Sequence, residues 1–313
     1  AALGLQRLVL LCLAATLACC ASAHYALPPR PPVRGAPPSP PRLPALVRVR
    51  LSLDATDRVV VAAPDASPLV LESRATLVHA SDGRVATRLE LPLPGGCPHW
   101  RIGERSYPGP LLAQVTRTGE LELYVELELE SYVEGVVASE IALWSALPAE
   151  LEAQAIVART YAAHALLATG ALSDTTQDQA YRGMYVPGDS RAAREVGQKL
   201  ARAVRATAGI VLTRAGTLLD ARYHAACGGG TAELRAVFPR AAQGSPPTAC
   251  LPCLERAAVE LGRGTPDPER PLGWRHEVST RDLQALASSL GLGPRLLELS
   301  PSTRDPAGRW LEV

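Results

Sequence analysis

Two consecutive helical segments, which together run from Leu129 to Ala168, constrain the fold of this chain most strongly. In the first segment the apolar residues stand at positions 129, 132, 133, 136 and 137, and they fall on one arc when each residue turns by about 100°. Glu140 falls within that arc, whereas Glu130 and Glu134 project to the opposite side. We therefore expect Glu140 to point inward or into a cleft, and the other two carboxylates to be solvated. Burial disfavours the charged form of a carboxyl group and so raises its pKa. A general acid needs such a raised pKa.

The second segment begins with Pro148, a residue suited to the first turn of a helix. Glu150 lies in that turn, where its charge complements the helix dipole. Small residues recur at positions 155, 158, 162 and 165, so one face of the helix can approach a neighbour closely. Gly170 is a stop signal for the helix, and residues 141–147 form the loop between the two segments.

Residues 46–128 alternate between apolar and polar residues in short runs, which is typical of strands. The runs are LVRVRLSL, RVVVAA, RVATRLELPL and ELELYVELEL. The pair of strands that flanks Thr118-Gly119 predicts a hairpin leading into the first helix. After the second helix, the chain predicts a polar loop over 173–183, a helix over 191–208 and a hairpin that turns at Ala215-Gly216. Because no regular βαβ repeat is present, we expect the α+β class.

The N-terminal part has the composition of an export signal followed by a spacer. Arg7 precedes an apolar run that ends in small residues, which is the pattern of a signal peptide over 1–23. Cleavage can follow Ala21-Ser-Ala23, or the run before Cys19 can serve as a lipoprotein box; both alternatives stay open. Residues 24–45 are rich in proline and predict an extended linker. We expect contact with a membrane only through this signal or a lipid anchor.

The chain has 313 residues, of which 47% are apolar, and its formal net charge is +1. That composition is sufficient for a sizeable core and, without a basic run, argues against nucleic acid as a partner. The core must be mainly aliphatic, because the chain contains a single Phe.

Four blocks follow one another in the order ESYVEGVVASE, LEAQAIVARTYA, Asp174 with QDQAYRG, and AVRATAGIVLTRAGTLLDARYHAACGGGTA. In this order they resemble the SpoIID/LytB family of exported cell-wall proteins, and the resemblance is densest over 107–237. It implies an α+β fold in which a strand-rich part over 46–128 carries a helical insert with the active-site Glu. Mixed hairpins and helices complete the fold, with a catalytic core over 129–240 and a C-terminal part over 241–313 that we expect to be truncated.

The resemblance implies a peptidoglycan lytic transglycosylase of the periplasm or cell envelope. Such an enzyme cleaves the MurNAc-GlcNAc β-1,4 bond of glycan strands, here those stripped of peptide, and leaves 1,6-anhydro ends during wall remodelling or sporulation-type engulfment. One Glu suffices, because the C6 hydroxyl of the sugar replaces the second carboxylate of ordinary glycosidases. Two alternatives remain: a non-catalytic amidase enhancer that binds glycan and stimulates a partner amidase, and a structural envelope protein. No cofactor is implied.

Carried over by the resemblance, the catalytic residue is Glu140. The substrate-binding candidates are Gln154, Arg159, Thr160, Tyr161, Gln179, Tyr181, Gly228, Gly229 and Thr231. Arg159 could orient Glu140 or a substrate oxygen, or it could form a buried structural ion pair. Gln179 and Tyr181 could bind sugar hydroxyls, and Tyr181 could stack on a sugar ring.

Four cysteines lie beyond the signal, and in an exported protein they favour disulfides. His224, Cys227, Cys250 and Cys253 also have spacings that zinc tolerates. The resemblance implies that zinc ligands of the family include positions in the polar loop, and here that loop offers neither His nor Cys, so we favour disulfides over a metal. Nearer the C-terminus we expect a strand at Trp274, a helix over 281–290 capped by Thr280, and one arm of a hairpin from Asp305.

Overall fold

The structure is a computed structural model, and it describes residues 41–53, 56–64, 66–224, 231–238, 248, 278–291, 303–304 and 310–312, the last two ranges by their backbone alone. The signal peptide, nearly all of the linker, Gly228, Gly229 and the strand predicted at Trp274 lie outside the described residues. The described part is of the α+β class, as the sequence predicts.

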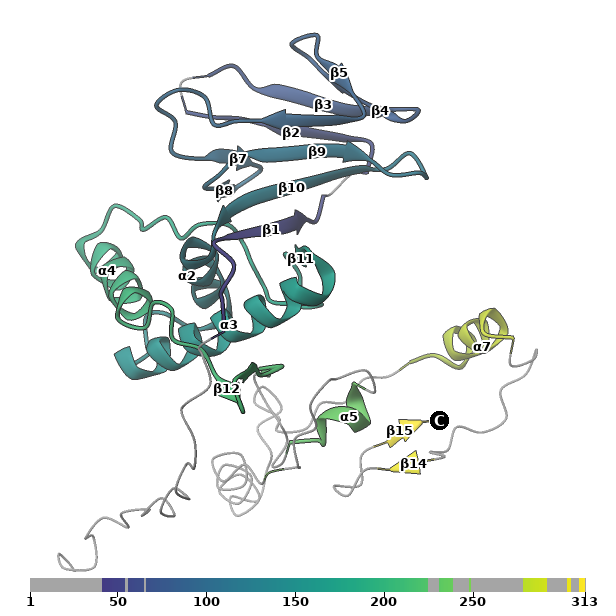
Figure 1. The fold of residues 1–313 in the computed structure, drawn as a ribbon. Helices are drawn as coiled ribbons and strands as arrows, with labels where there is room; N and C mark the ends of the chain where they lie inside the picture. The colour runs from purple at the N-terminus through teal and green to yellow at the C-terminus, as the bar shows by residue number, and fades with distance from the viewer. Residues whose placement is uncertain are drawn as a thin grey trace, which may run out of the picture. The chain divides into compact units, whose positions relative to one another are not determined.

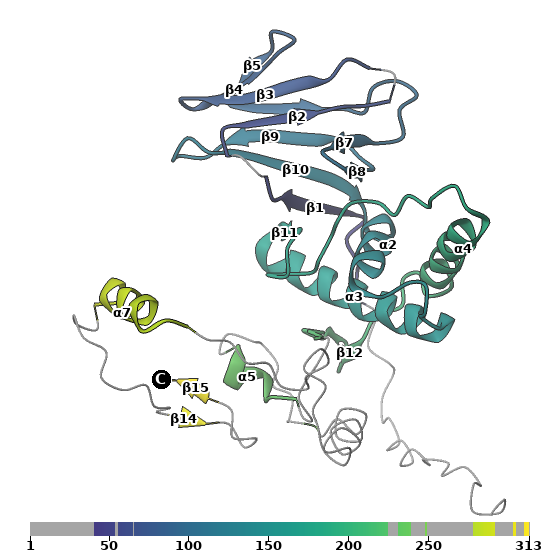
Figure 2. The same cartoon turned by 180° about the vertical axis from the view of Figure 1, so that it is seen from behind.

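The central element is a five-stranded sheet with the strand order β11-β1-β10-β9-β6. Its members are β1 (Leu46–Leu51), β6 (Arg88–Leu91), β9 (Leu111–Val115), β10 (Leu121–Glu128) and β11 (Leu172–Ser173). Neighbouring strands of this sheet pair antiparallel, with one exception. The edge strand β11 runs parallel to its neighbour β1 (Figure 2). In β10 every second residue from Leu121 to Leu127 is buried, so one face of this strand covers the core. The predicted hairpin around Thr118-Gly119 is confirmed as β9 and β10.

A four-stranded antiparallel sheet consists of β2 (Arg58–Val61), β3 (Leu69–Arg74), β4 (Leu77–Ala80) and β5 (Val85–Ala86). A short hairpin, β7 (Trp100–Ile102) with β8 (Arg105–Tyr107), pairs beside it. The run RVATRLELPL, given above as a strand signal, holds two strands, β5 and β6, in different sheets. The chain bends at Thr87 and passes from one sheet to the other, a change that a continued alternation cannot reveal.

Three helices follow β10: α2 (Leu129–Glu140), α3 (Pro148–Thr169) and α4 (Arg191–Ala206). The predicted ends of α3 are confirmed, since Pro148 is its first residue and Gly170 follows it in the left-handed conformation, with φ 73°. Glu150 accepts a hydrogen bond from the backbone N–H of Leu147 at 2.8 Å, which satisfies a donor at the start of the helix. As Figure 1 shows, α2 lies between β1 and α3, and it also packs against α4.

Gly135 allows the chain to pass very close to α2. A Cβ atom at this position would lie 2.4 Å from Cε2 of Tyr181 and 2.6 Å from the carbonyl oxygen of Gly183. Real side chains do not approach so closely, so only glycine fits there. This contact packs the segment after β11 against the buried face of α2.

The remaining described elements are short. They are β12 (Thr213–Arg214), β13 (Thr217–Leu218), α5 (Leu234–Val237), α7 (Thr280–Ser289), β14 (Thr303–Arg304) and β15 (Trp310–Glu312). The hairpin at Ala215-Gly216 is present but shorter than predicted, since only two residue pairs face each other. The cap of α7 is Ser279 rather than Thr280: its hydroxyl accepts the N–H of Asp282 at 3.1 Å.

The predicted C-terminal arm is β15, and its partner β14 precedes it in the chain. Among the described residues, none of the helices combines the length and the apolar character needed to cross a membrane.

Candidate active site around Glu140

Glu140 is the last residue of α2, and it lines a pocket of about 580 Å³. The helix leaves its carboxylate at the entrance of the loop to α3, as the sequence predicts. The other lining residues come from α3, from the polar loop after β11 and from the chain after β13: Tyr161, Thr176, Gln177, Asp178, Arg222, Tyr223, His224 and Phe238. Four segments that are distant in the sequence therefore converge on one carboxylate.

The polar loop fixes the end of α2 by two backbone hydrogen bonds. The N–H of Ala180 donates to Oε1 of Glu140 at 2.7 Å. The N–H of Arg182 donates to the hydroxyl of Ser139 at 3.1 Å, and that hydroxyl donates to the carbonyl of Gly135 at 2.7 Å. Hydrogen bonds from backbone amides hold a carboxylate without neutralising its charge.

The second hydrogen-bond partner of the Glu140 carboxylate is the hydroxyl of Tyr223. Gln179 supports Tyr223, because its Nε2 donates to the Tyr223 hydroxyl at 3.1 Å while its Oε1 accepts from Tyr132 at 3.3 Å. Burial, and then the charge of Glu140, raise the pKa of Tyr223 above its ordinary value of 10.0. The phenol therefore stays protonated at neutral pH and acts as a hydrogen-bond donor.

Asp178 is a second carboxylate in the pocket, but both of its oxygens have partners. Oδ1 accepts from the hydroxyl of Tyr161 at 2.9 Å, and Oδ2 accepts from the backbone N–H of Ser173 at 2.7 Å. Burial first, and then the nearby Asp178 charge, raise the pKa of Tyr161 above 10.0, so this tyrosine is also a donor. Asp178 thus ties the polar loop to α3 and to β11.

Arg222 provides the cationic wall of the pocket. Its guanidinium lies 3.9 Å from the ring centroid of Phe238 and 5.8 Å from that of Tyr161. It is also 3.0 Å from the buried carboxylate of Asp220. Within the described residues no Lys or Arg forms an ion pair with Glu140. Glu140, like Asp178, is therefore held by neutral donors. Because the Asp178 oxygens join the loop to α3 and β11, Glu140 is the carboxylate in this pocket that is left to give and take a proton.

Arg159 does not reach Glu140. Its side chain is fully buried and forms a bidentate pair with Glu130, at 2.8 Å from Nε and 2.6 Å from Nη2. Of the two roles considered for Arg159, the structure therefore shows the structural ion pair and not the orientation of Glu140. The expectation that Glu130 is simply solvated is wrong, because its carboxylate also accepts the N–H of Gly209 at 3.3 Å. Glu134 is half-buried rather than solvated, and burial raises its pKa from 4.5, an effect that Arg205 partly offsets.

The other predicted site residues fall into two groups. Tyr161, Thr160, Gln179 and Tyr181 are all buried, but only Tyr161 lines the pocket, whereas the other three do not. The ring of Tyr181 packs against Tyr107 and Tyr132, at centroid distances of 6.2 and 5.2 Å, and its exposed fraction is 0%. Stacking of Tyr181 on a sugar does not fit this arrangement.

Three predicted residues have other surroundings in the structure. The hydroxyl of Thr160 accepts the N–H of Leu212 at 3.0 Å and donates to Ile156 at 2.6 Å, so it joins α3 to the chain before β12. Nε2 of Gln154 is buried, with no hydrogen-bond partner in the described part of the chain. Thr231 exchanges hydrogen bonds with Thr248 and does not line the pocket around Glu140.

Sequence reasoning missed Asp178, Arg222, Tyr223 and Phe238 as lining residues. Asp178, Arg222 and Tyr223 stand inside the quoted blocks, but local patterns do not show which polar side chains turn towards Glu140. Among the described residues no group of His, Cys, Asp and Glu could hold a metal ion. Cys227, Cys250 and Cys253 lie outside those residues, and Cys97 is a free, half-buried cysteine.

Comparison with known proteins gave one family. Residues 117–214 match the family model described as Stage II sporulation protein, SpoIID. This range includes β10, the whole of α2, α3 and α4, and the loop that holds Glu140. No curated protein matched the chain. The match supports assignment to the SpoIID family and indicates a function related to the cell wall in sporulation.

Proposed function

We propose that this chain, which carries a SpoIID domain over residues 117–214, is a peptidoglycan lytic transglycosylase with Glu140 as its acid and base. The observation that carries the proposal is the setting of Glu140. Its carboxylate lies in an open pocket, is held by the Ala180 N–H and the Tyr223 hydroxyl, and has no basic ion-pair partner among the described residues.

In the first step the Glu140 carboxyl gives its proton to the glycosidic oxygen between MurNAc and GlcNAc. The bond from this oxygen to the anomeric carbon breaks, and the GlcNAc unit leaves with a free 4-hydroxyl. In the second step the C6 hydroxyl of the same MurNAc attacks the anomeric carbon, and its proton returns to Glu140. No water is consumed, and the product carries a 1,6-anhydro ring.

Tyr223 and the Ala180 N–H stabilise the carboxylate that exists between the two proton transfers. Tyr161 and Arg222 form walls that can contact the sugar. Asp178 is assigned a structural role, because both of its oxygens are already bonded. The substrate lies outside the cytoplasmic membrane, so the proposal includes export directed by the N-terminal apolar segment.

The test is Glu140→Gln, which keeps the shape of the side chain but cannot transfer the proton. General acid–base catalysis is typically worth ~10²–10⁴-fold, and one group serves both steps here, so we expect a loss near the upper end of that range. Products from peptide-free glycan are measured by mass. Asp178→Asn is the matched control: it should keep activity within ~10-fold, because Asp178 acts only through packing and hydrogen bonds.

Two outcomes would contradict the proposal. Formation of 1,6-anhydro ends by Glu140→Gln at the wild-type rate would remove Glu140 from the chemistry. If the wild-type protein forms no such ends but binds glycan and stimulates a cell-wall amidase, the protein is the enhancer rather than the enzyme.

A further inference from the structure

Trp144 is an exposed aromatic residue in the loop that joins α2 to α3. It is 66% exposed, although a Trp that packs in a core buries more area than almost any other residue. Trp100 shows that ordinary arrangement: it is 6% exposed, and its indole N–H donates to the carbonyl of Leu91 at 3.3 Å. The indole N–H of Trp144 has no hydrogen-bond partner among the described residues. Both the ring and its donor are therefore available to a ligand.

Trp144 lines an open pocket of about 460 Å³ together with one face of α4. The residues of the helix recur at spacings of three or four, so they form a single stripe. They are Ala192, Glu195, Val196, Lys199 and Arg202. Cationic donors and a carboxylate acceptor thus surround one aromatic ring. This combination fits a ligand that has an apolar face and hydrogen-bonding groups at its edge.

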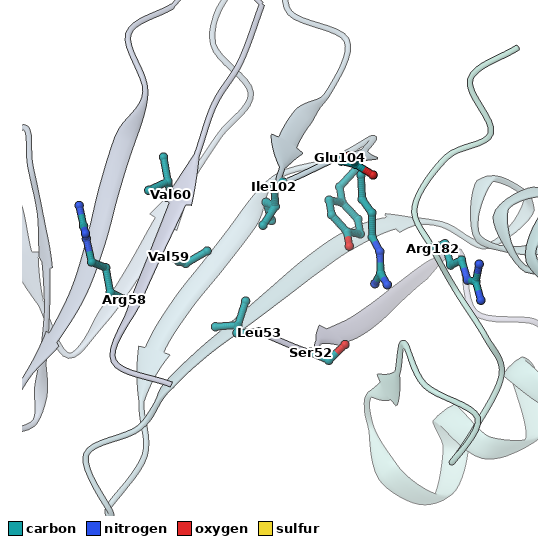
Figure 3. A pocket seen from close by; sticks show the side chains of 11 residues that line it. Ser52, Leu53, Arg58, Val59, Val60, Ile102, Glu104 and Arg182 are labelled. Atoms are coloured by element: carbon teal, nitrogen blue, oxygen red, sulfur yellow. The ribbon is translucent and has the colours of Figure 1, made fainter. Parts of the chain in front are cut away.

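A different pocket, of about 790 Å³, offers a contrast (Figure 3). It lies between the end of β1, β2, the β7–β8 hairpin and the polar loop. Two of its cations already face carboxylates, since Arg58 stands 3.6 Å from Glu72 and Arg105 stands 3.5 Å from Asp174. Its aromatic lining residue, Tyr107, is only 2% exposed. Unlike the pocket beside α4, it presents no aromatic surface on which a ligand can stack.

Lys199 holds the loop that carries Trp144. Its Nζ donates to the carbonyls of Leu143 and Ala146, both at 2.8 Å, so the loop is fixed to α4 on each side of Trp144. Lys199 is the only lysine of the chain. A single nitrogen with three donors can bind two converging carbonyls, for which the planar guanidinium group of Arg is less suited. The ring therefore stands on a fixed loop and loses little freedom when a ligand covers it.

The same loop begins at Glu140. Trp144 follows Glu140 by four residues, and four residues of extended chain span at most ~14 Å. That distance corresponds to a few sugar units. Because the substrate proposed for Glu140 is a polymer, a sugar ring some units away from the cleaved bond can lie on Trp144.

We propose that Trp144 and the stripe on α4 form a further sugar-binding subsite, which holds a ring of the glycan strand away from the cleaved bond. The inference rests on the proposed action on glycan. A β-1,4-linked pyranose has C–H groups on its faces, which stack on the indole ring, and polar groups around its edge, which meet Arg202 and Glu195. The carboxylate of Glu195 accepts hydroxyl groups but repels an anionic membrane surface, so a sugar fits the pocket better than a lipid head group.

The experiment measures equilibrium binding of glycan oligomers with Glu140→Gln as the background, so that no ligand is consumed. The ligands are a disaccharide, a tetrasaccharide and an octasaccharide of the MurNAc-GlcNAc repeat. In the background protein the affinity should rise with length. Adding Trp144→Ala should reduce this rise ~10-fold, because Trp residues contribute a large share of the affinity at binding surfaces. The urea midpoint of unfolding should not change, since the side chain is exposed.

Leu147→Ala is the matched control. Leu147 is 62% exposed on the same loop but does not line the pocket, so the rise with length should persist. Lys199→Met removes both hydrogen bonds to the loop and should also reduce the rise. Combining it with Trp144→Ala should cause no further loss, because Lys199 acts through the position of Trp144. Additive losses would exclude that role for Lys199.

Three results would overturn the subsite. The first is an unchanged rise with length in the Trp144→Ala variant. The second is an equal loss of affinity for every oligomer, which would place Trp144 at the cleaved bond or in the fold. The third is weaker binding of this variant to phosphatidylglycerol vesicles with glycan binding intact, since the surface would then dock on a membrane. If wild-type protein makes no 1,6-anhydro ends yet Trp144→Ala reduces the rise with length, only the proposed catalysis fails.

Discussion

The two ends of α2 carry glutamates in opposite electrostatic settings. At the N-terminal end Glu130 forms a bidentate pair with Arg159, which is fully buried. At the C-terminal end Glu140 is held by the N–H of Ala180 and the hydroxyl of Tyr223. The first carboxylate is committed to a cation in the core, whereas the second is held only by neutral donors. The same residue type therefore serves stability at one end of the helix and chemistry at the other.

The reason lies in what surrounds each end. Near Glu130, Arg159 also donates to the carbonyls of Ile210 and Val204, at 3.1 and 3.4 Å, so this ion pair joins α2 and α3 to α4 and to the chain that follows it. Near Glu140 the polar loop offers backbone amides in place of cations. A strong ion pair stabilises the charged form of a carboxyl group, so it would oppose the protonation that a general acid needs.

The largest expected effect on stability is that of Glu130→Ala. It would leave the guanidinium of Arg159 buried without its anionic partner, and removing one partner of a buried pair costs about 3–5 kcal/mol. Because the Glu130 side chain is 39% exposed, water can reach the site, and we expect the lower end of that range. The measurement is the free energy of unfolding from urea denaturation.

The matched control for this variant is Glu195→Ala. Glu195 pairs with Arg191 at 2.8 Å, but both side chains are well exposed, at 59% and 89%. Exposed pairs contribute about 0–1 kcal/mol, so this change should hardly alter stability. Equal effects of the two substitutions would mean that the Glu130–Arg159 pair is not structural.

Gly135→Ala tests whether the fit of the loop against α2 positions the Glu140 end. The new Cβ atom would collide with Tyr181 and with the backbone of Gly183, and such overpacking costs about 1–3 kcal/mol. We also expect a loss of glycan cleavage, since the displaced loop carries Ala180. Both quantities are measured on one preparation.

Gly197→Ala is the control in another helix. Its new Cβ atom would meet Cε1 of Tyr185 at 3.2 Å, a much milder contact with a side chain. Ala is favoured over Gly in a helix by about 1 kcal/mol in both variants, so the difference between them isolates the collision. If Gly135→Ala is as stable and active as Gly197→Ala, the close approach does not position the site.

Tyr223→Phe removes one neutral donor from Glu140 and leaves the ring in place. A net hydrogen bond is worth about 0.5–1.5 kcal/mol, and bonds to charged groups are at the upper end, so we expect kcat to fall ~10-fold. Stability should change by about 1 kcal/mol or less. Tyr124→Phe is the control, because its hydroxyl donates to Glu122 at 2.9 Å on the sheet, away from the pocket. Equal activities of the two variants would exclude a role for Tyr223.

Local signals were sufficient to predict α2, α3 and the hairpin into α2, because Pro148, Gly170 and the apolar periodicity act within a few residues. The position of Glu140 followed from the same periodicity. The partner of Arg159 could not be predicted, since the pair with Glu130 joins residues 29 positions apart. The division of the RVATRLELPL run between two sheets could not be predicted either, because it depends on pairing partners that lie elsewhere in the chain.

The predicted sugar-binding roles show the same limit. Gln179 and Tyr181 stand in a polar loop, and a polar loop is expected on the surface. In the structure this loop packs against α2 at Gly135, and both side chains are buried. The loop then exposes its backbone amides and Asp178 to the site instead. Only the packing of two distant segments decides which side chains of the loop face the ligand.

Glu134, between the two ends of α2, has the smallest expected effect. Burial raises its pKa above 4.5 in the folded protein, so the folded state binds this proton more tightly than the unfolded state does. The contribution of Glu134 to stability is therefore most favourable below pH 4.5 and declines as the pH rises through the folded pKa. Glu134→Gln removes the titration, and the variant should gain stability relative to wild type between pH 4 and pH 7. The gain should stay within about 0.5 kcal/mol, because the side chain is only half-buried. Urea denaturation at both pH values measures it, and a variant that loses stability relative to wild type as the pH rises would show that Glu134 has a cationic partner, as Glu130 does.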